Sequence, residues 1–183
     1  MRACDKLEKA DLSLYNTEIS DVGGQALSAG LGRPGLEDLD FRLHGTKVGD
    51  LTGVALGQSL SSCDKMVNLY LAMSDTNMGN DSGIALGRAL RQCPRIIKLY
   101  LNLYNTKIAD AGGQALAEGL ASPELKYLEL ALHSTIIGDR TAIALGSSLR
   151  ACDKLEKAVL PLYNTKITDV GGEPLARGLD RPE

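Results

Sequence analysis

The stretch LYNTKIADAGGQALAEGL, residues 103–120, decides the fold because close copies of it recur in the same chain. LYNTEISDVGGQALSAGL occupies residues 14–31, and LYNTKITDVGGEPLARGL occupies residues 162–179. Two interpretations compete for it. The Gly-Gly pair before a helical-looking segment would form a phosphate cradle, or the whole segment is one unit of a repeat array. The first interpretation points to an enzyme and the second to a scaffold.

A period of 29 or 30 residues runs through the chain and favours the second interpretation. Segments related to LxxLxL begin at Leu7, Leu36, Met66, Ile96, Leu125 and Leu155. A threonine follows each start by ten residues, Asp or Asn by fourteen, and leucine by twenty. We therefore predict one domain over residues 1–183, built from the repeats 4–33, 34–62, 63–92, 93–122, 123–151 and 152–183.

One repeat contains the pattern of a strand followed by the pattern of a helix. Leu99, Leu101 and Leu103 alternate with polar or aromatic residues, which predicts a strand with one buried face. Asp110 precedes a stretch with apolar residues at helical spacing. Aspartate is a favoured N-cap, so we expect its carboxylate to accept from the N–H groups in the first turn of its own helix.

Such a unit cannot bury its apolar residues alone, so neighbouring units must stack. Strands lie about 4.8 Å apart in a sheet, whereas packed helices need about 8–10 Å. This mismatch predicts a curved arc with strands on the concave side and helices on the convex side. Small residues on each helix should permit close approach, among them Ala26, Gly30, Ala55, Ser59, Ala85, Ala89, Ala115, Gly119, Ala144 and Ser148.

The consensus LxxLxLxLxxTxIxDxGxxALxxxL resembles the leucine-rich repeat, in the long subtype found in ribonuclease inhibitor and in Ran GTPase-activating protein. The resemblance covers residues 4–180 and implies an α/β solenoid with a parallel sheet. The family usually carries Asn or Cys two residues closer to the strand than Thr17 and its equivalents lie. We expect the threonine hydroxyls to bind turn backbone in its place.

Composition excludes several classes of function. The net charge of −3, with both signs mixed, argues against a nucleic-acid-binding surface. No apolar run approaches the roughly 18–20 residues of a membrane span, so we expect no membrane insertion. The N-terminus resembles neither a signal nor a transit peptide, and we predict a cytoplasmic protein in a reducing compartment.

The motifs that resemble chemistry have simpler explanations. Gly23–Gly24, Gly112–Gly113 and Gly171–Gly172 are predicted to be packing glycines, because the preceding Asp would repel a phosphate. The four cysteines, spaced by the repeat, are predicted to be thiols, although Cys63 and Cys93 fall in adjacent repeats and their pairing stays open. We find no catalytic, metal or cofactor constellation, and we expect a protein that is not an enzyme.

All six tyrosines fall on outward strand-side positions, whereas the single phenylalanine, Phe41, falls on an inward one. Tyrosine is enriched at interfaces, since it offers apolar area and a polar tip with few rotors to freeze. The same face also carries charged and amide side chains. The predicted partner-binding residues are Asp38, Asp40, Arg42, Tyr70, Tyr100, Asn102, Tyr104, Tyr127, Glu129 and His133.

The leading functional hypothesis is therefore a non-enzymatic scaffold that binds a protein partner through its concave face. The resemblance also leaves open a GTPase-activating fragment, in which Arg42 would be the one concave arginine. A third alternative is a structural subunit held by its solenoid ends. Leu7, Leu12 and Leu14 would have no covering neighbour, and Pro161 and Pro174 make the last repeat atypical, so we expect membership of a larger assembly.

Overall fold

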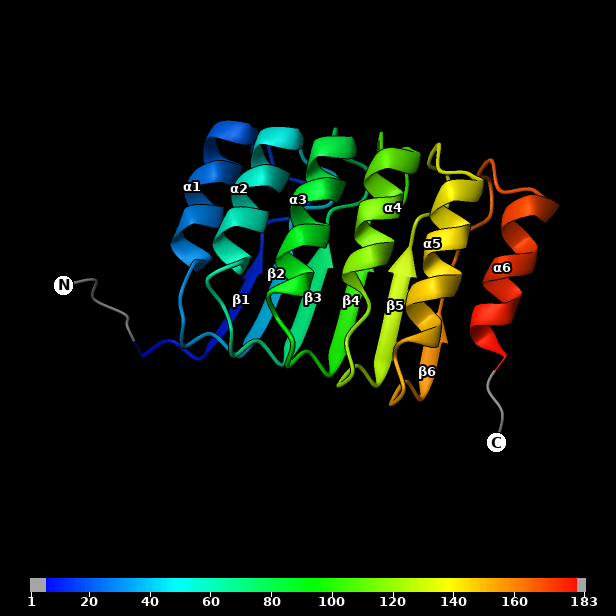
Figure 1. Ribbon diagram of the computed structural model, residues 1–183. Coiled ribbons are helices and arrows are strands. Elements are labelled where there is room, and N and C mark those ends of the chain that lie inside the picture. The colour runs from blue at the N-terminus through cyan, green and yellow to red at the C-terminus, as the bar shows by residue number, and fades with distance from the viewer. Residues whose placement is uncertain (1–5, 181–183) are drawn as a thin grey trace.

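The computed structural model describes residues 6–180, in which six strands alternate with six helices (Figure 1). The strands are β1 (Lys9–Ser13), β2 (Asp38–Arg42), β3 (Asn68–Ala72), β4 (Lys98–Asn102), β5 (Tyr127–Ala131) and β6 (Lys157–Val159). The helices are α1 (Asp21–Leu31), α2 (Asp50–Leu60), α3 (Asn80–Arg91), α4 (Asp110–Gly119), α5 (Asp139–Arg150) and α6 (Asp169–Leu179). Each predicted repeat thus holds one strand and one helix.

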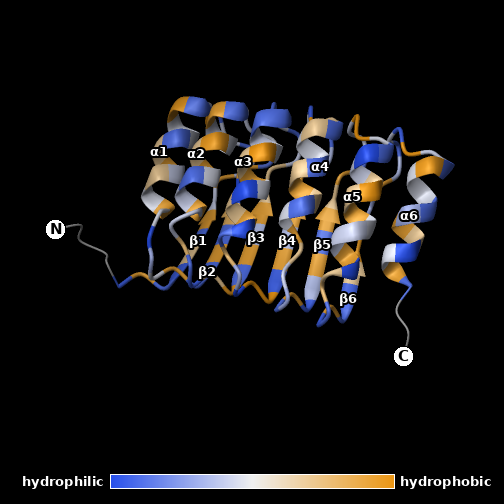
Figure 2. Cartoon of the chain, in the orientation of Figure 1, coloured by the Kyte–Doolittle hydropathy of each residue, from blue (hydrophilic) through white to orange (hydrophobic). Residues whose placement is uncertain are grey.

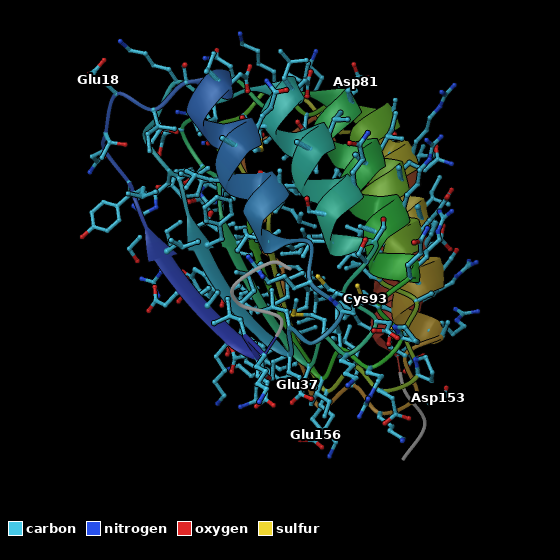
Figure 3. The ribbon with its side chains drawn as sticks, turned by 90° about the vertical axis from the view of Figure 1, so that its left-hand side faces the viewer. Glu18, Glu37, Asp81, Cys93, Asp153 and Glu156 are labelled. Atoms are coloured by element: carbon cyan, nitrogen blue, oxygen red, sulfur yellow. The ribbon has the colours of Figure 1, made fainter. Side chains whose placement is uncertain are left out.

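The six strands form one parallel sheet whose spatial order is the order of the sequence. All six helices cover one side of this sheet and fan out more widely than the strands do (Figure 1). The view along the stack shows two layers, with Cys93 between them (Figure 3). The architecture is the predicted α/β solenoid of six strand–helix repeats, with the sheet on its inner side.

The core lies between the two layers and is almost wholly aliphatic. Leu99 and Leu101 are 2% and 1% exposed, while Lys98, Tyr100 and Asn102 face the other side of the sheet. Phe41 is fully buried, as predicted. Hydrophobic colour runs along the strands, whereas the helices carry alternating bands of both kinds (Figure 2). Period-two alternation therefore places the core on the helix side of the sheet.

Each strand ends in the same turn. A threonine hydroxyl donates to the carbonyl three residues earlier, for example Thr46 Oγ1 to Leu43 O at 2.6 Å. The other five threonines of this register do likewise: Thr17, Thr76, Thr106, Thr135 and Thr165. The residue before each threonine has a positive φ: Asn16, Gly45, Asp75, Asn105, Ser134 and Asn164. Gly, Asn, Asp and Ser are the residue types that suit such turns, and the expectation for the hydroxyls is confirmed.

The Asp or Asn residue at the start of each helix does not cap its own helix, which corrects the sequence-based expectation. Oδ1 of Asp110 accepts from the backbone N–H groups of Gly138 and Thr141, at 2.7 and 3.1 Å, and from the Thr141 hydroxyl at 2.9 Å. These donors belong to the first turn of α5, in the next repeat. The residues that bind the following helix in this way are Asp21, Asp50, Asn80, Asp110 and Asp139.

The physical reason is the position of this residue. It is the first residue inside the helix, with its N-cap one residue earlier, so its side chain points sideways to the neighbouring helix. Hydrogen bonds lower the pKa of three of these carboxylates, those of Asp21, Asp110 and Asp139. Burial alone would raise the pKa of Asp21, but the Thr52 hydroxyl and the N–H groups of Gly49 and Thr52 lower that pKa below its ordinary value.

Neighbouring helices approach closely because small residues face each other. A Cβ on Gly83 would lie 2.7 Å from Gly112 Cα, and one on Gly113 would meet the side chains of Thr141 and Ile137. Gly24 stands in the same relation to Thr52. These glycines are structural, and an aspartate or asparagine of the preceding repeat already occupies the N-termini of α2 to α6, where an anion would bind.

Three of the cysteines are buried thiols, Cys63, Cys93 and Cys152, while Cys4 lies outside the described residues. Cys93 Sγ lies 3.6 Å from the carbonyl of Cys63 and 3.5 Å from that of Leu60, with its thiol as the donor. Burial raises the pKa of the Cys93 thiol to about 12. Cys63 and Cys93 thus pack as small apolar residues that donate to backbone.

The last strand is shortened by its proline. β6 pairs with β5 over three residues only, from Lys157 to Val159. Pro161 O accepts from Leu132 N at 3.1 Å, and the N–H and C=O of one extended residue point to the same edge. The N–H that Pro161 lacks would therefore face β5 and not the outer edge, so this proline does not close the stack. Over residues 6–180, no helix combines the length and the hydrophobicity that crossing a bilayer requires.

Candidate functional site

The face of the sheet that the helices leave open, here called the strand face, carries all ten predicted partner-binding residues. Backbone register aligns them in rows across the strands. One row is Asp38, Asn68, Lys98 and Tyr127, and the next is Asp40, Tyr70, Tyr100 and Glu129. A third row is Arg42, Ala72, Asn102 and Ala131. The fourth row follows the strand ends and is Tyr15, His44, Ser74, Tyr104, His133 and Tyr163.

Three tyrosines from two of these rows stack across neighbouring strands, and we call them the tyrosine row. Tyr70 and Tyr100 come from the second row and Tyr127 from the first. The ring centroids of Tyr70 and Tyr100 are 5.4 Å apart, and those of Tyr100 and Tyr127 are 4.6 Å apart. Cations lie at both ends of the row. The Arg42 guanidinium is 4.7 Å from the Tyr70 centroid, and Lys157 Nζ is 5.3 Å from the Tyr127 centroid. Sheet spacing places the rings at stacking distance.

A second set of stacked rings, the histidine row, lies beside the first at the ends of the strands. The His133 ring lies between Tyr104 and Tyr163, with centroid distances of 4.5 and 4.3 Å. Tyr15 stacks on His44 at 4.7 Å. The buried Ser74 separates the two groups.

The histidines serve packing in this arrangement. Nδ1 of His44 and Nδ1 of His133 are buried and have no hydrogen-bond partner within residues 6–180. The predicted set contains Tyr104 and His133 but omits Tyr15, His44 and Tyr163, which complete the same row. The shared repeat register already places these three residues in one row with Tyr104 and His133 in the sequence.

Arg42 and Asp40 form an ion pair on the strand face, and Glu129 accepts from a tyrosine hydroxyl. Arg42 donates from Nε and Nη2 to the two oxygens of Asp40, at 2.7 and 2.5 Å, and this bidentate pair raises the pKa of Arg42 above its ordinary value. The hydroxyl of Tyr127 lies 3.2 Å from Glu129 Oε2. Burial first, and then that hydrogen bond, raises the pKa of Tyr127. Arg42 and Tyr127 therefore keep their ordinary charges at neutral pH, +1 and zero.

Asn102 lies in the third row between Ala72 and Ala131, both of which are buried. Its Oδ1 is buried without a hydrogen-bond partner in the part of the chain that the structure describes. The strand face thus carries two sets of stacked rings, the tyrosine row and the histidine row, with the third row between them in the register of the sheet.

The chemistry that this arrangement supports is recognition. Stacked phenols, an imidazole and paired charges offer apolar area and hydrogen-bonding tips. Among residues 6–180, no three or more His, Cys, Asp or Glu side chains are grouped so as to hold a metal ion.

Comparisons with known proteins add two structural resemblances. No family model matches the chain, and no curated protein matches it either. Of solved structures, 46 chains match. Leiomodin-1 Actin-Binding Site 2 is 19% identical with a TM-score of 0.48, over 69% of this chain and 72% of that one. An internalin (inlF) from Listeria monocytogenes is 12% identical with a TM-score of 0.23, over 94% of this chain and 86% of that one.

Proposed function

We propose that this protein is a non-enzymatic interaction scaffold that binds a partner protein through its strand face, as part of a larger assembly. The observation that carries the proposal is the pair of stacked rows on that face, the tyrosine row and the histidine row. The repeat length of 29–30 residues, with a helix of 10 to 12 residues in each repeat, supports the ribonuclease-inhibitor-like subtype.

Stacking makes these rings suitable for binding. A tyrosine held between neighbours has already lost much of its rotational freedom, so little further entropy is lost when a partner covers it. Tyr, Trp and Arg are also the residues that most often dominate interface energetics. Tyr100 has a ring on each side, and Arg42 is fixed over Tyr70 by Asp40. We expect the centre of the interface at Tyr70 and Tyr100.

The GTPase-activating alternative receives less support. An arginine that stabilises a phosphoryl-transfer transition state must reach the phosphate. The Arg42 guanidinium is instead held by both oxygens of Asp40 and lies over a ring. Reaching a nucleotide would require breaking a bidentate ion pair, so we do not propose this activity.

The test begins with partners isolated from the protein's own source and then purified. Affinity of each purified partner would be measured for the native chain, for Tyr70→Ala and for Tyr100→Ala, by calorimetry or surface plasmon resonance. Loss of a buried ring at the interface centre should weaken binding about tenfold or more.

The control is Gln58→Ala. Gln58 lies in α2, on the opposite side of the sheet from the strand face, and its side chain is exposed. This variant should bind as the native chain does. Equal affinity of all four proteins for every partner would overturn the proposal and favour a subunit held by its ends.

A further inference from the structure

The chain of inter-repeat hydrogen bonds is incomplete at both ends of the stack. Asp169 has the register of the five side chains that bind the next helix, but it is exposed and no described helix follows it. At the other end, the matching donors are the N–H groups of Ser20 and Gly23 in the first turn of α1. No described carboxylate reaches them, and the N-cap Ser20 makes no side-chain cap bond. One end thus offers an acceptor and the other end offers its donors.

The end helices α1 and α6 each carry an uncovered glycine at a position where neighbouring helices pack closely inside the stack. Among residues 6–180, a Cβ on Gly172 would meet nothing within 4 Å, whereas a Cβ at the equivalent Gly24 or Gly113 would strike the next repeat. Gly30 of α1 is likewise open, whereas its equivalents Gly119 and Gly178 lie against backbone of the preceding helix. The positions that permit close packing inside the stack are therefore vacant at both ends.

Apolar side chains are incompletely covered at both ends. In the last repeat, Leu160, Leu162 and Leu175 are half-buried. The equivalent leucines of repeat 93–122 are at most 1% exposed: Leu101, Leu103 and Leu116. In the first repeat Leu12 and Leu14 are half-buried. A neighbour in the normal register would bury all of them.

The histidine row ends in an open ring at each side of the molecule. Tyr163 is 61% exposed beyond His133, and Tyr15 is 48% exposed before His44. In the register of the repeats these two rings would be neighbours across a junction. Stacking would then run without interruption from Tyr104 of one copy to His44 of the next.

We propose that a second copy of this chain docks head to tail on the first. Strand β1 of one copy lies parallel beside β6 of the other, and Asp169 accepts from Ser20 and Gly23 of the incoming α1. The same two surfaces remain free on the outer sides of the pair. The contact is therefore heterologous, and it adds further copies instead of closing a two-fold dimer.

Like charges would face each other across this contact and lower its affinity. ACDKLEKA occurs at residues 3–10 and again at 151–158, so the junction would face Lys6 with Lys154, Glu8 with Glu156 and Lys9 with Lys157. On one side of each pair the charge is already engaged. Lys154 binds Glu124, Glu156 binds Lys126, and Lys157 lies over Tyr127.

A favourable pair, Lys166 with Glu18, would also form across the junction, as Lys47 and Glu18 do inside the chain. Exposed like-charge pairs are weak and are screened by salt. We therefore expect weak association, in the range of about 10 µM to about 1 mM, that strengthens as salt rises.

The experiment measures mass against concentration by sedimentation equilibrium, at about 0.05 M and about 0.5 M NaCl. The native chain should grow beyond 19.4 kDa with concentration, more so at high salt. Gly172→Leu blocks the α6 end and Gly30→Leu blocks the α1 end. Each has open space in the monomer, so urea unfolding should show no loss of stability.

Mixing the two variants gives the decisive result. Each alone should stay monomeric, because every junction needs one free end of each kind. The mixture should form a species of twice 19.4 kDa and stop there, since the free α1 end of Gly172→Leu meets the free α6 end of Gly30→Leu. Gln58→Leu adds the same side chain away from the ends and should associate as the native chain does.

A second pair of variants tests the carboxylate itself. Asp169→Asn should retain most association, because Asn80 already accepts from the next helix at 3.0 and 2.9 Å. Asp169→Ala should weaken association about tenfold.

A native chain that stays at 19.4 kDa under all conditions would overturn the proposal, as would larger species that Gly172→Leu leaves unchanged. None of these changes alters Tyr70 or Tyr100, so the outcome is independent of the function proposed for the strand face.

Discussion

At the scale of single residues, the Asp or Asn side chain at the start of each helix from α1 to α5 connects one repeat to the next. Its acceptor oxygen replaces an intrahelical partner for the first turn of the following helix, where N–H groups are otherwise unsatisfied. The Thr168 backbone N–H and hydroxyl, with the Gly171 N–H, lower the pKa of Asp139 in the same way. A carboxylate whose pKa falls on folding contributes stability above its unfolded pKa of about 3.9 and loses it as pH falls.

Asp110→Asn tests this linkage. Burial alone would raise the pKa of Asp110, but hydrogen bonds from Gly138 and Thr141 lower it overall. The variant keeps an acceptor oxygen and loses the charge, so near pH 7 it should unfold at most about 1 kcal/mol more easily than the native chain. This difference should shrink as pH falls from about 5 to about 2, where the native carboxylate protonates. Urea midpoints at each pH measure it, and a constant difference would contradict the linkage.

At the scale of elements, helix-to-helix distance is set by glycines whose neighbours are backbone atoms. A Cβ on Gly87 of α3 would strike the carbonyl carbon and oxygen of Ala115 and the nitrogen of Leu116, all in α4. Backbone cannot move aside as the end of a flexible side chain can. Glycine is a poor helix former, and its presence inside α3 is explained by this close approach.

Gly87→Ala should therefore lower the free energy of unfolding by about 1–3 kcal/mol, although alanine is the better helix former. Gly30→Ala is the matched control, because nothing lies within 4 Å of the added Cβ. It should raise stability by about 0.5–1 kcal/mol. If close packing determines stability, thermal or urea unfolding should show a lower free energy of unfolding for Gly87→Ala and a higher one for Gly30→Ala. Equal effects of the two substitutions would refute this account.

At the scale of the whole molecule, each repeat contacts only its neighbours, so the end repeats have one neighbour where the others have two. β6 pairs over three residues and α6 contains Pro174. Within residues 6–180, β1 pairs along one edge only, with β2. Stability should therefore fall from the centre of the stack to its ends.

Hydrogen exchange measured at low protein concentration should show this gradient. Amides of β3 and β4 should exchange roughly tenfold or more slowly than those of β1 and β6, because opening an end repeat exposes less core. Uniform protection across all six strands would mean that the molecule unfolds only as a whole. Slower exchange at the ends as concentration rises would be expected from head-to-tail contact.

The sequence by itself determined the repeat register, the strand and helix of each unit, the inward position of Phe41 and the side of the sheet on which the tyrosines lie. These follow from periods of two and 3.6 residues and from turn residues such as Thr46, all of which act over a few positions. The tertiary structure alone decided that Asp110 binds α5 and that Pro161 faces β5. Those contacts join residues 28 to 31 positions apart. Their partners are fixed by how closely one repeat packs on the next, which no local pattern specifies.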